Sequence, residues 1–172
     1  MGWLVWTIIK VAVGFIVGFI FKDYIKEKLY FIVIILSKVF GRRSKVKGLW
    51  LASFKYPDVL DDSGELITYH EVVRLYSAFN FVVGVIVPHD QNGERAAELS
   101  NRTPLRVLGS IKDNSHFTGN WYHPEDNFNF YGAFQLNILP SNIQMNGRWI
   151  GFNTSRNIGC NEWVWKKIQD SE

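Results

Sequence analysis

The chain has 172 residues, of which 47% are hydrophobic and 16% aromatic, which suits one globular domain with a small appendage. Residues 1–47 carry nine Lys or Arg against two Asp or Glu, whereas residues 48–172 carry ten against fourteen, so the larger part lacks the basic face with which domains bind polymeric DNA or RNA. The single cysteine, Cys160, excludes an intrachain disulfide and fits a reducing compartment.

Residues 3–21, WLVWTIIKVAVGFIVGFIF, form the first predicted element, a membrane-spanning helix. As a helix they would rise roughly 28 Å, which is about the thickness of the hydrocarbon core of a bilayer. The segment contains twelve Leu, Ile, Val or Phe residues. At about −0.3 to −0.6 kcal/mol each, these outweigh one lysine at roughly +3 kcal/mol, so insertion is favoured.

Lys10, Gly14 and Gly18 recur at intervals of four along this helix, and Thr7 extends the stripe that they form. Gly14 and Gly18 make a GxxxG pair, which allows two helix backbones to pack closely in lipid. Lys10 could then face water or a partner carbonyl in an assembly. The stripe predicts an assembly surface, and chance glycines beside a snorkelling lysine are the alternative.

Residues 29–40, LYFIVIILSKVF, predict a second and shorter membrane span, with an interfacial or buried helix as the alternative. A basic cluster follows it directly: Arg42, Arg43, Lys45 and Lys47. The positive-inside rule places such a cluster in the cytoplasm. We therefore expect two parts, with one or two transmembrane helices and a basic joint in residues 1–47 and a cytoplasmic β domain in residues 48–172.

From Gly48 onward, short runs of alternating apolar and polar residues are separated by turn-forming residues, which predicts eight strands. The clearest run is 127–152, where two alternating stretches flank a turn at 139–142 and predict a hairpin. Short consecutive strands favour an all-β fold, an eight-stranded antiparallel meander closed as a small lipocalin-like β-barrel. The expected strands are residues 48–56, 65–76, 79–88, 103–112, 115–123, 127–138, 142–152 and 157–168.

A glycine two positions before a bulky residue recurs along these strands, as in GNW at 119–121 and GRW at 147–149. The two residues share one face of a strand, and inside a narrow barrel a large ring needs a small neighbour. We therefore expect tryptophans to fill the interior. The expected interior tryptophans are Trp50, Trp121, Trp149, Trp163 and Trp165.

Catalytic and metal-binding patterns are absent from the sequence. It contains no phosphate-binding glycine loop, no H-E-x-x-H and no G-x-S-x-G, so we do not expect an enzyme or a cofactor. His116 and His123 have no cysteine or carboxylate at ligand spacing, so no metal site is expected. Glu71 is a candidate buried acid, for which a structural pair with an arginine is the simpler interpretation.

Arginines interleaved with aromatic residues are the remaining candidates for ligand binding. Guanidinium groups hold phosphate oxygens in pairs of hydrogen bonds, and aromatic faces stack nucleobases at roughly 1–3 kcal/mol per base. For each arginine alone, a solvated side chain on a polar sheet face is the alternative. Because aromatic residues crowd the interior, we expect a ligand at a barrel mouth or in a surface groove. The candidates are Arg74, Tyr76, Arg106, Tyr122, Tyr131, Arg148 and Arg156.

Two apolar N-terminal segments, a basic joint and a β-rich domain with repeated G-x-W phrases resemble the SMODS-associated, two-transmembrane, β-strand-rich effectors of bacterial CBASS antiphage systems. The resemblance covers nearly the whole chain. Its most specific parts are GNW at 119–121, YGAF at 131–134, GRWIG at 147–151 and EWVW at 162–165. The second apolar segment is shorter than this family's pattern requires.

The resemblance implies a cytoplasmic β-barrel that binds a cyclic dinucleotide made by a partner nucleotidyltransferase during infection. Binding would promote homo-oligomerisation in the bacterial inner membrane, disruption of the lipid bilayer and death of the infected cell. Two other interpretations stay open: a membrane-tethered, lipocalin-like carrier of a small apolar ligand, and a structural membrane protein whose barrel docks another protein. A carrier needs an empty apolar interior, whereas the effector needs cationic and aromatic groups at a mouth.

Overall fold

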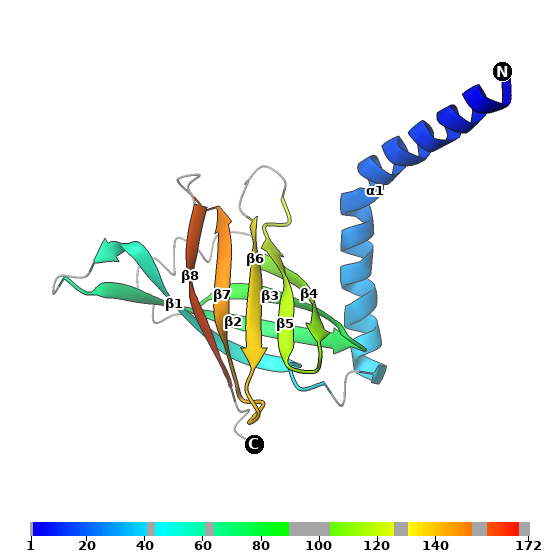
Figure 1. The fold of residues 1–172 in the computed structure, drawn as a ribbon. Helices are drawn as coiled ribbons and strands as arrows, with labels where there is room; N and C mark the ends of the chain where they lie inside the picture. Colours follow the sequence, from blue (N-terminus) through cyan, green and yellow to red (C-terminus); the bar gives the residue numbers. More distant parts are fainter. Residues whose placement is uncertain are drawn as a thin grey trace. The chain divides into compact units, whose positions relative to one another are not determined.

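The computed structural model describes residues 2–40, 44–60, 64–89, 104–125, 131–152 and 158–168. Over these residues the chain forms one α-helix and eight β-strands (Figure 1), in two compact units, Met1–Ile32 and Val33–Glu172. The elements are α1 (Gly2–Phe40), β1 (Gly48–Leu60), β2 (Leu66–Ala78), β3 (Phe81–Pro88), β4 (Leu105–Lys112), β5 (His116–Tyr122), β6 (Tyr131–Ile138), β7 (Gln144–Phe152) and β8 (Ile158–Lys167).

Helix α1 is one continuous helix of 39 residues, where the sequence predicted two separate segments. The polar residues 22–28, KDYIKEK, lie inside it. No glycine or proline occurs between residues 19 and 40 to end a helix, and Lys and Glu are good helix formers. The helix therefore continues through residues 22–28. Within the described part of the chain, no helix has both the length and the apolar character needed to cross a bilayer.

The last turns of α1 belong to the same compact unit as the barrel. Val33 and Ser37 are buried there, whereas most of residues 29–40 are exposed. The Lys47 Nζ donates a 3.0 Å hydrogen bond to the carbonyl oxygen of Ser37, and the Phe40 ring stacks on that of Phe79 with 5.1 Å between centroids. These contacts hold the end of the helix beside the turn between β2 and β3.

The eight strands pair antiparallel in sequence order and close into a barrel through pairing of β8 with β1. This confirms the predicted meander, and the predicted strands overlap the observed ones throughout. Strand β1 extends past its predicted end, with a register shift between Lys55 and Leu60. Pro57 lies within that shift, and because proline cannot donate a backbone hydrogen bond, it interrupts the ladder there.

The barrel interior is packed with the predicted aromatic side chains. All five tryptophans are buried, with Trp50 and Trp165 fully inaccessible. Glycines make room for them, as predicted: a Cβ added at Gly132 would lie 2.5 Å from the Trp121 ring, which no real Cβ contact allows. The interior is therefore filled by side chains, as expected for a barrel of eight strands.

The strand connections define two ends of the barrel. Three short turns, β2–β3, β4–β5 and β6–β7, lie with the start of β1 at one end, here called the turn end. The connections β1–β2, β3–β4, β5–β6 and β7–β8 leave from the opposite end, here called the loop end. Residues 61–63, 90–103, 126–130 and 153–157 of these four connections lie outside the described residues.

Candidate ligand-binding surface

Three of the predicted ligand-binding residues are direct neighbours across adjacent strands. Arg106 on β4 opposes Tyr122 on β5, which opposes Tyr131 on β6. The adjoining residues Trp121 and Gly132 are buried and point into the barrel. Because successive side chains in a strand point to opposite faces, all three predicted residues lie on the outer face.

This line of residues continues on both sides. On β7, Phe152 follows Gly151, which opposes Gly132 beside Tyr131, and the Phe152 and Tyr131 rings are in contact. On the other side, Val85 on β3 opposes Arg106, and Arg74 on β2 opposes Val85. The register therefore joins four predicted residues with two that were not predicted, Val85 and Phe152. We call this set the outer row: Arg74, Val85, Arg106, Tyr122, Tyr131 and Phe152.

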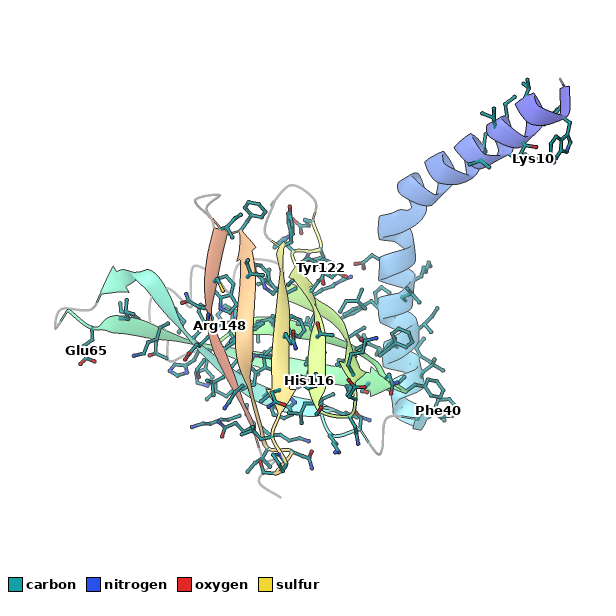
Figure 2. All side chains as sticks on the ribbon, viewed as in Figure 1. Lys10, Phe40, Glu65, His116, Tyr122 and Arg148 are labelled. Atoms are coloured by element: carbon teal, nitrogen blue, oxygen red, sulfur yellow. The ribbon has the colours of Figure 1, made fainter. Side chains whose placement is uncertain are left out.

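The outer row lies at the loop end over β5, β6 and β7. Tyr122 is the last residue of β5, Tyr131 the first of β6 and Phe152 the last of β7; Figure 2 labels Tyr122 at this end of its strand. The Tyr131 side chain is 53% exposed, and its ring lies 5.3 Å from that of Phe152 between centroids. An accessible aromatic face is thus held in place by a second ring.

Phe152 could have been found from the sequence by counting register back from the 139–142 turn. The turn sets which residues of β6 and β7 oppose each other, since Ile138 pairs with Met145 and each further pair moves one residue along both strands. Applied to Tyr131, this count reaches Phe152. The aromatic candidates were predicted from their proximity to arginines, without the register that this turn imposes.

The other predicted residues lie elsewhere or outside the described residues. Tyr76 is on the same outer face of β2 as Arg74, two residues closer to the turn end. Arg148 lies on β7 between Gln135 and Glu162, four residues from Phe152 and therefore about 13 Å along the strand from the outer row. Figure 2 shows Arg148 on the middle of the barrel wall. Arg156 falls in the β7–β8 connection, outside the described residues.

The outer row combines the two groups that recognise nucleotides. Arg74 and Arg106 are two strands apart, so their backbones are separated by roughly 10 Å. Each guanidinium can hold a phosphate through charge-assisted hydrogen bonds, while the face of Tyr131 can stack a base. One ligand with phosphates and bases alternating around a ring could therefore contact both kinds of group.

Glu71 is the acidic side chain of the barrel interior. It alternates with buried Tyr69 and Val73 on β2, so it points inward, and its cross-strand neighbours are Ala52 and Pro88. The predicted pairing with an arginine is therefore not seen across the ladder. Removal of the carboxyl from water raises the pKa of Glu71 to about 8, so at neutral pH it is mostly protonated.

Indole donors accompany this acid in the interior. Trp165 pairs with Ala52, the neighbour of Glu71, and Trp163 precedes it on the same face of β8. The Nε1 atoms of Trp163 and Trp165 are buried without a hydrogen-bond partner among the described residues. By contrast, Trp50 Nε1 donates a 2.7 Å hydrogen bond to the carbonyl oxygen of Val46. The interior is thus aromatic but not wholly apolar.

A serine–histidine pair on the outer face of β1 and β2 was missed by sequence reasoning. Ser53 and His70 are register partners, with 3.0 Å between Ser53 Oγ and His70 Nδ1. The His89 ring lies 6.5 Å from that of His70. Burial, and then the nearby His89, lower the pKa of His70 and keep it a neutral imidazole. Such a base could accept the serine proton, but its neighbour is a second imidazole where catalytic triads place a carboxylate.

The two histidines that the sequence singled out make local contacts. His116 Nδ1 lies 2.9 Å from the Ser115 hydroxyl, and His123 Nδ1 accepts a 3.1 Å hydrogen bond from the backbone N–H of Glu125. Across the described ranges, no three His, Cys, Asp or Glu side chains come together in a group that could hold a metal ion.

The predicted assembly stripe lies in the unit Met1–Ile32. Lys10, Gly14 and Gly18 are all exposed, and a Cβ added at either glycine would meet nothing within 4 Å. Thr7, which extends the stripe, donates its hydroxyl to the carbonyl oxygen of Trp3 at 3.0 Å. The helix backbone at the two glycines is thus open to a close neighbour.

The sequence matches no protein-family model and no curated protein.

Proposed function

We propose that this protein is a membrane-anchored effector whose cytoplasmic β-barrel binds a cyclic dinucleotide on the outer row. The observation that carries the proposal is the register that aligns Arg106, Tyr122 and Tyr131 on neighbouring strands at the loop end, with Arg74 in the same row two strands from Arg106. Isolated arginines on a sheet face are usually solvated, but two arginines in line with aromatic side chains that contact each other match a ligand that carries phosphates and bases.

The rest of the mechanism rests on the sequence and its family resemblance. The apolar residues 3–21 would anchor the chain in the bacterial inner membrane, and the basic cluster at 42–47 would keep the barrel in the cytoplasm. A partner nucleotidyltransferase would supply the ligand during phage infection. Ligand binding would then drive homo-oligomerisation through the stripe that contains Lys10, Gly14 and Gly18, and the assembly would disrupt the membrane.

The packing of the interior disfavours the carrier of a small apolar ligand. Such a carrier needs an apolar cavity, whereas here five indoles are buried within the barrel, and Trp121 is packed against Gly132 and Gly151. Glu71 adds a carboxyl group to the same space. A fatty acid would have to displace these side chains, so the outer face is the better site for a ligand.

Calorimetry on the full chain in detergent micelles, with a panel of cyclic dinucleotides and a fatty acid, tests the proposal. Arg106→Ala should weaken binding of the preferred cyclic dinucleotide by about 1.5–3 kcal/mol, because it removes charge-assisted hydrogen bonds to a phosphate. Tyr131→Ala should cost roughly 1–3 kcal/mol through lost stacking.

Arg148→Ala is the control, since Arg148 is an exposed arginine on the outer face of the barrel wall but lies outside the outer row. It should leave affinity within about 0.5 kcal/mol of the unsubstituted protein. Binding of the fatty acid alone would favour the carrier. Equal losses from Arg106→Ala and Arg148→Ala would show that the ligand does not bind at the outer row.

A further inference from the structure

The turn end of the barrel and the last turn of α1 carry an excess of positive charge. Lys38, Lys45, Lys112 and Lys166 are all exposed there. None has a carboxylate partner among the residues that the structure describes. The acidic side chain described at this end is Asp113, in the turn between β4 and β5. Among the described residues, this end therefore carries four exposed ammonium groups and one carboxylate.

Large apolar side chains project from the same end. Phe79 and Phe81 at the β2–β3 turn are 68% and 59% exposed, and Ile143 before β7 is 50% exposed. Phe40, which stacks on Phe79, is 54% exposed and is labelled at the end of α1 in Figure 2. Val39 beside it is 66% exposed. An aromatic patch therefore continues from the barrel turn onto the helix end.

The backbone at Phe79 gives independent support for a role of this patch. Phe79 has φ of 55°, a left-handed conformation that hairpin turns normally fill with glycine or asparagine. A bulky aromatic residue there costs stability. Its ring stacks on that of Phe40 but is still 68% exposed, so burial within the chain offsets only part of that cost. An outlier of this kind points to a contact made outside the chain.

We propose that the turn end of the barrel docks on an anionic lipid surface. Phenylalanine rings would enter the boundary between headgroups and acyl chains, while the lysines at the same end of the barrel would interact with anionic headgroups. Together, Lys38, Lys45, Lys112, Lys166, Phe40, Phe79, Phe81 and Ile143 form the lipid-docking patch. The proposal goes beyond ligand sensing, because it concerns the turn end of the barrel, whereas Arg106, Tyr122 and Tyr131 lie at the loop end.

A lipid surface fits this patch better than an acidic protein. The rings project from a tight two-residue turn and a helix end, so they present protruding tips and not a recess that would receive a partner's side chain. The lysines are spread over α1, β4 and β8 and the segment before β1, which suits a continuous field of charge. A phosphatidylglycerol-containing bilayer supplies both the field and a deformable apolar layer.

The test uses the full chain reconstituted in vesicles and an environment-sensitive fluorophore attached at one cysteine. Native Cys160 is exposed on β8 near the loop end and provides the reference position. Ile143→Cys combined with Cys160→Ser places the probe at the turn end. The vesicles contain phosphatidylcholine alone or with about one third phosphatidylglycerol, which gives the membrane a negative surface potential.

With anionic vesicles, the probe at position 143 should shift to the blue and brighten, and salt should reverse the change. The probe at Cys160 should not change. Equal responses from the two positions, or no response from position 143, would overturn the proposal. An equal response at position 143 in uncharged vesicles would refute the role of the lysines.

Charge and ring substitutions test the patch itself in the Ile143→Cys, Cys160→Ser protein. Each lysine near an anionic surface should raise the docking constant about fivefold, so Lys112→Glu with Lys166→Glu should lower it by at least about 25-fold. Lys55→Glu is the control, since Lys55 is an exposed lysine on β1 on the loop-end side of the barrel. If Lys55→Glu reduced the probe response as much, net charge and not this patch would be responsible.

Phe79→Asn removes a ring while keeping a residue that adopts the left-handed conformation, and it should abolish most of the blue shift. Ligand affinity measured by calorimetry should be unchanged in every patch variant, because none of the patch residues belongs to the outer row and Arg106, Tyr122 and Tyr131 lie at the loop end. Failure of cyclic dinucleotides to bind would therefore reject the proposed function and leave the docking result standing. Retention of the full blue shift in Phe79→Asn would reject docking through the rings.

Discussion

Glu71 makes the stability of the barrel depend on pH in a direction opposite to that of an ordinary carboxylate. Burial raises its pKa from the usual 4.5 to about 8. Between these two values the folded chain keeps the proton while the unfolded chain has released it. The folded state therefore binds more protons, and by linkage the free energy of unfolding falls as the pH rises from about 4.5 to about 8. Above about 8 no further loss occurs.

The size of this loss follows from the shift of the pKa. At about 1.4 kcal/mol per unit, a shift of roughly 3.5 units has a ceiling near 5 kcal/mol. The Glu71 side chain is half-buried, so some water reaches it and the loss will be smaller. We expect about 2–3 kcal/mol to disappear over the whole range from about pH 4.5 to pH 8. Glu71→Gln keeps the shape of the protonated acid but cannot ionise, so it should remove this dependence.

Urea unfolding of the full chain in detergent, followed by tryptophan fluorescence, measures the effect because five of the indoles lie in the barrel interior. The original chain and Glu71→Gln should have similar stability near or below pH 4.5, and the variant should be the more stable of the two near pH 8 or above. Other titrating groups affect both proteins and cancel in the difference. A difference that did not change with pH would show that Glu71 is solvated, and the assignment of a desolvated acid to the interior would be wrong.

Three further changes have defined outcomes. In Gly147→Ala the added Cβ would collide with a main-chain oxygen of β6, so the free energy of unfolding in urea should fall by at least about 1–3 kcal/mol. In Gly159→Ala the nearest neighbour of the added Cβ is a ring atom at 3.1 Å, so the fall should be smaller. Equal falls in the two variants would contradict the packing argument. Phe79→Asn should change stability by less than about 1 kcal/mol in the same assay, because relief of backbone strain offsets the lost ring stacking. Gly14→Leu with Gly18→Leu should preserve cyclic dinucleotide binding but abolish ligand-dependent oligomers and dye leakage from vesicles. Leakage at the level of the original chain would show that the stripe anchors the chain but does not mediate assembly.

The barrel was predictable because local and long-range signals agree along its strands. The alternation from Tyr131 to Ile138 reappears in the structure as strictly alternating exposed and buried side chains. Glycine spacing predicted which rings face inward, and the structure places Trp121 against Gly132 and Gly151. Each of these patterns depends only on the pleat of a strand and on the size of neighbouring side chains. Closure follows because eight such strands pair in order.

The helix and the binding surface were harder to predict for different physical reasons. Polar residues 22–28 interrupt the hydropathy of α1 but not its helix propensity, so a change in composition was mistaken for a break in the helix. Composition could list arginines near aromatics, yet only register shows that Arg106 joins Tyr122 and Tyr131 while Arg148 does not. Register errors of one residue would move each of these side chains to the opposite face.

The filled interior constrains how a ligand could signal through this barrel. Residues of the outer row alternate along each strand with residues of the packed interior, as Tyr122 does with Trp121 and Tyr131 with Gly132. A ligand held by β4, β5 and β6 would therefore tie together strands whose inner faces are already close-packed. Such packing resists gradual deformation. The coupling to assembly would then act through rigid displacement or reorientation of the whole barrel, and under the docking proposal the lysines and rings at its turn end would hold or release that barrel at a membrane.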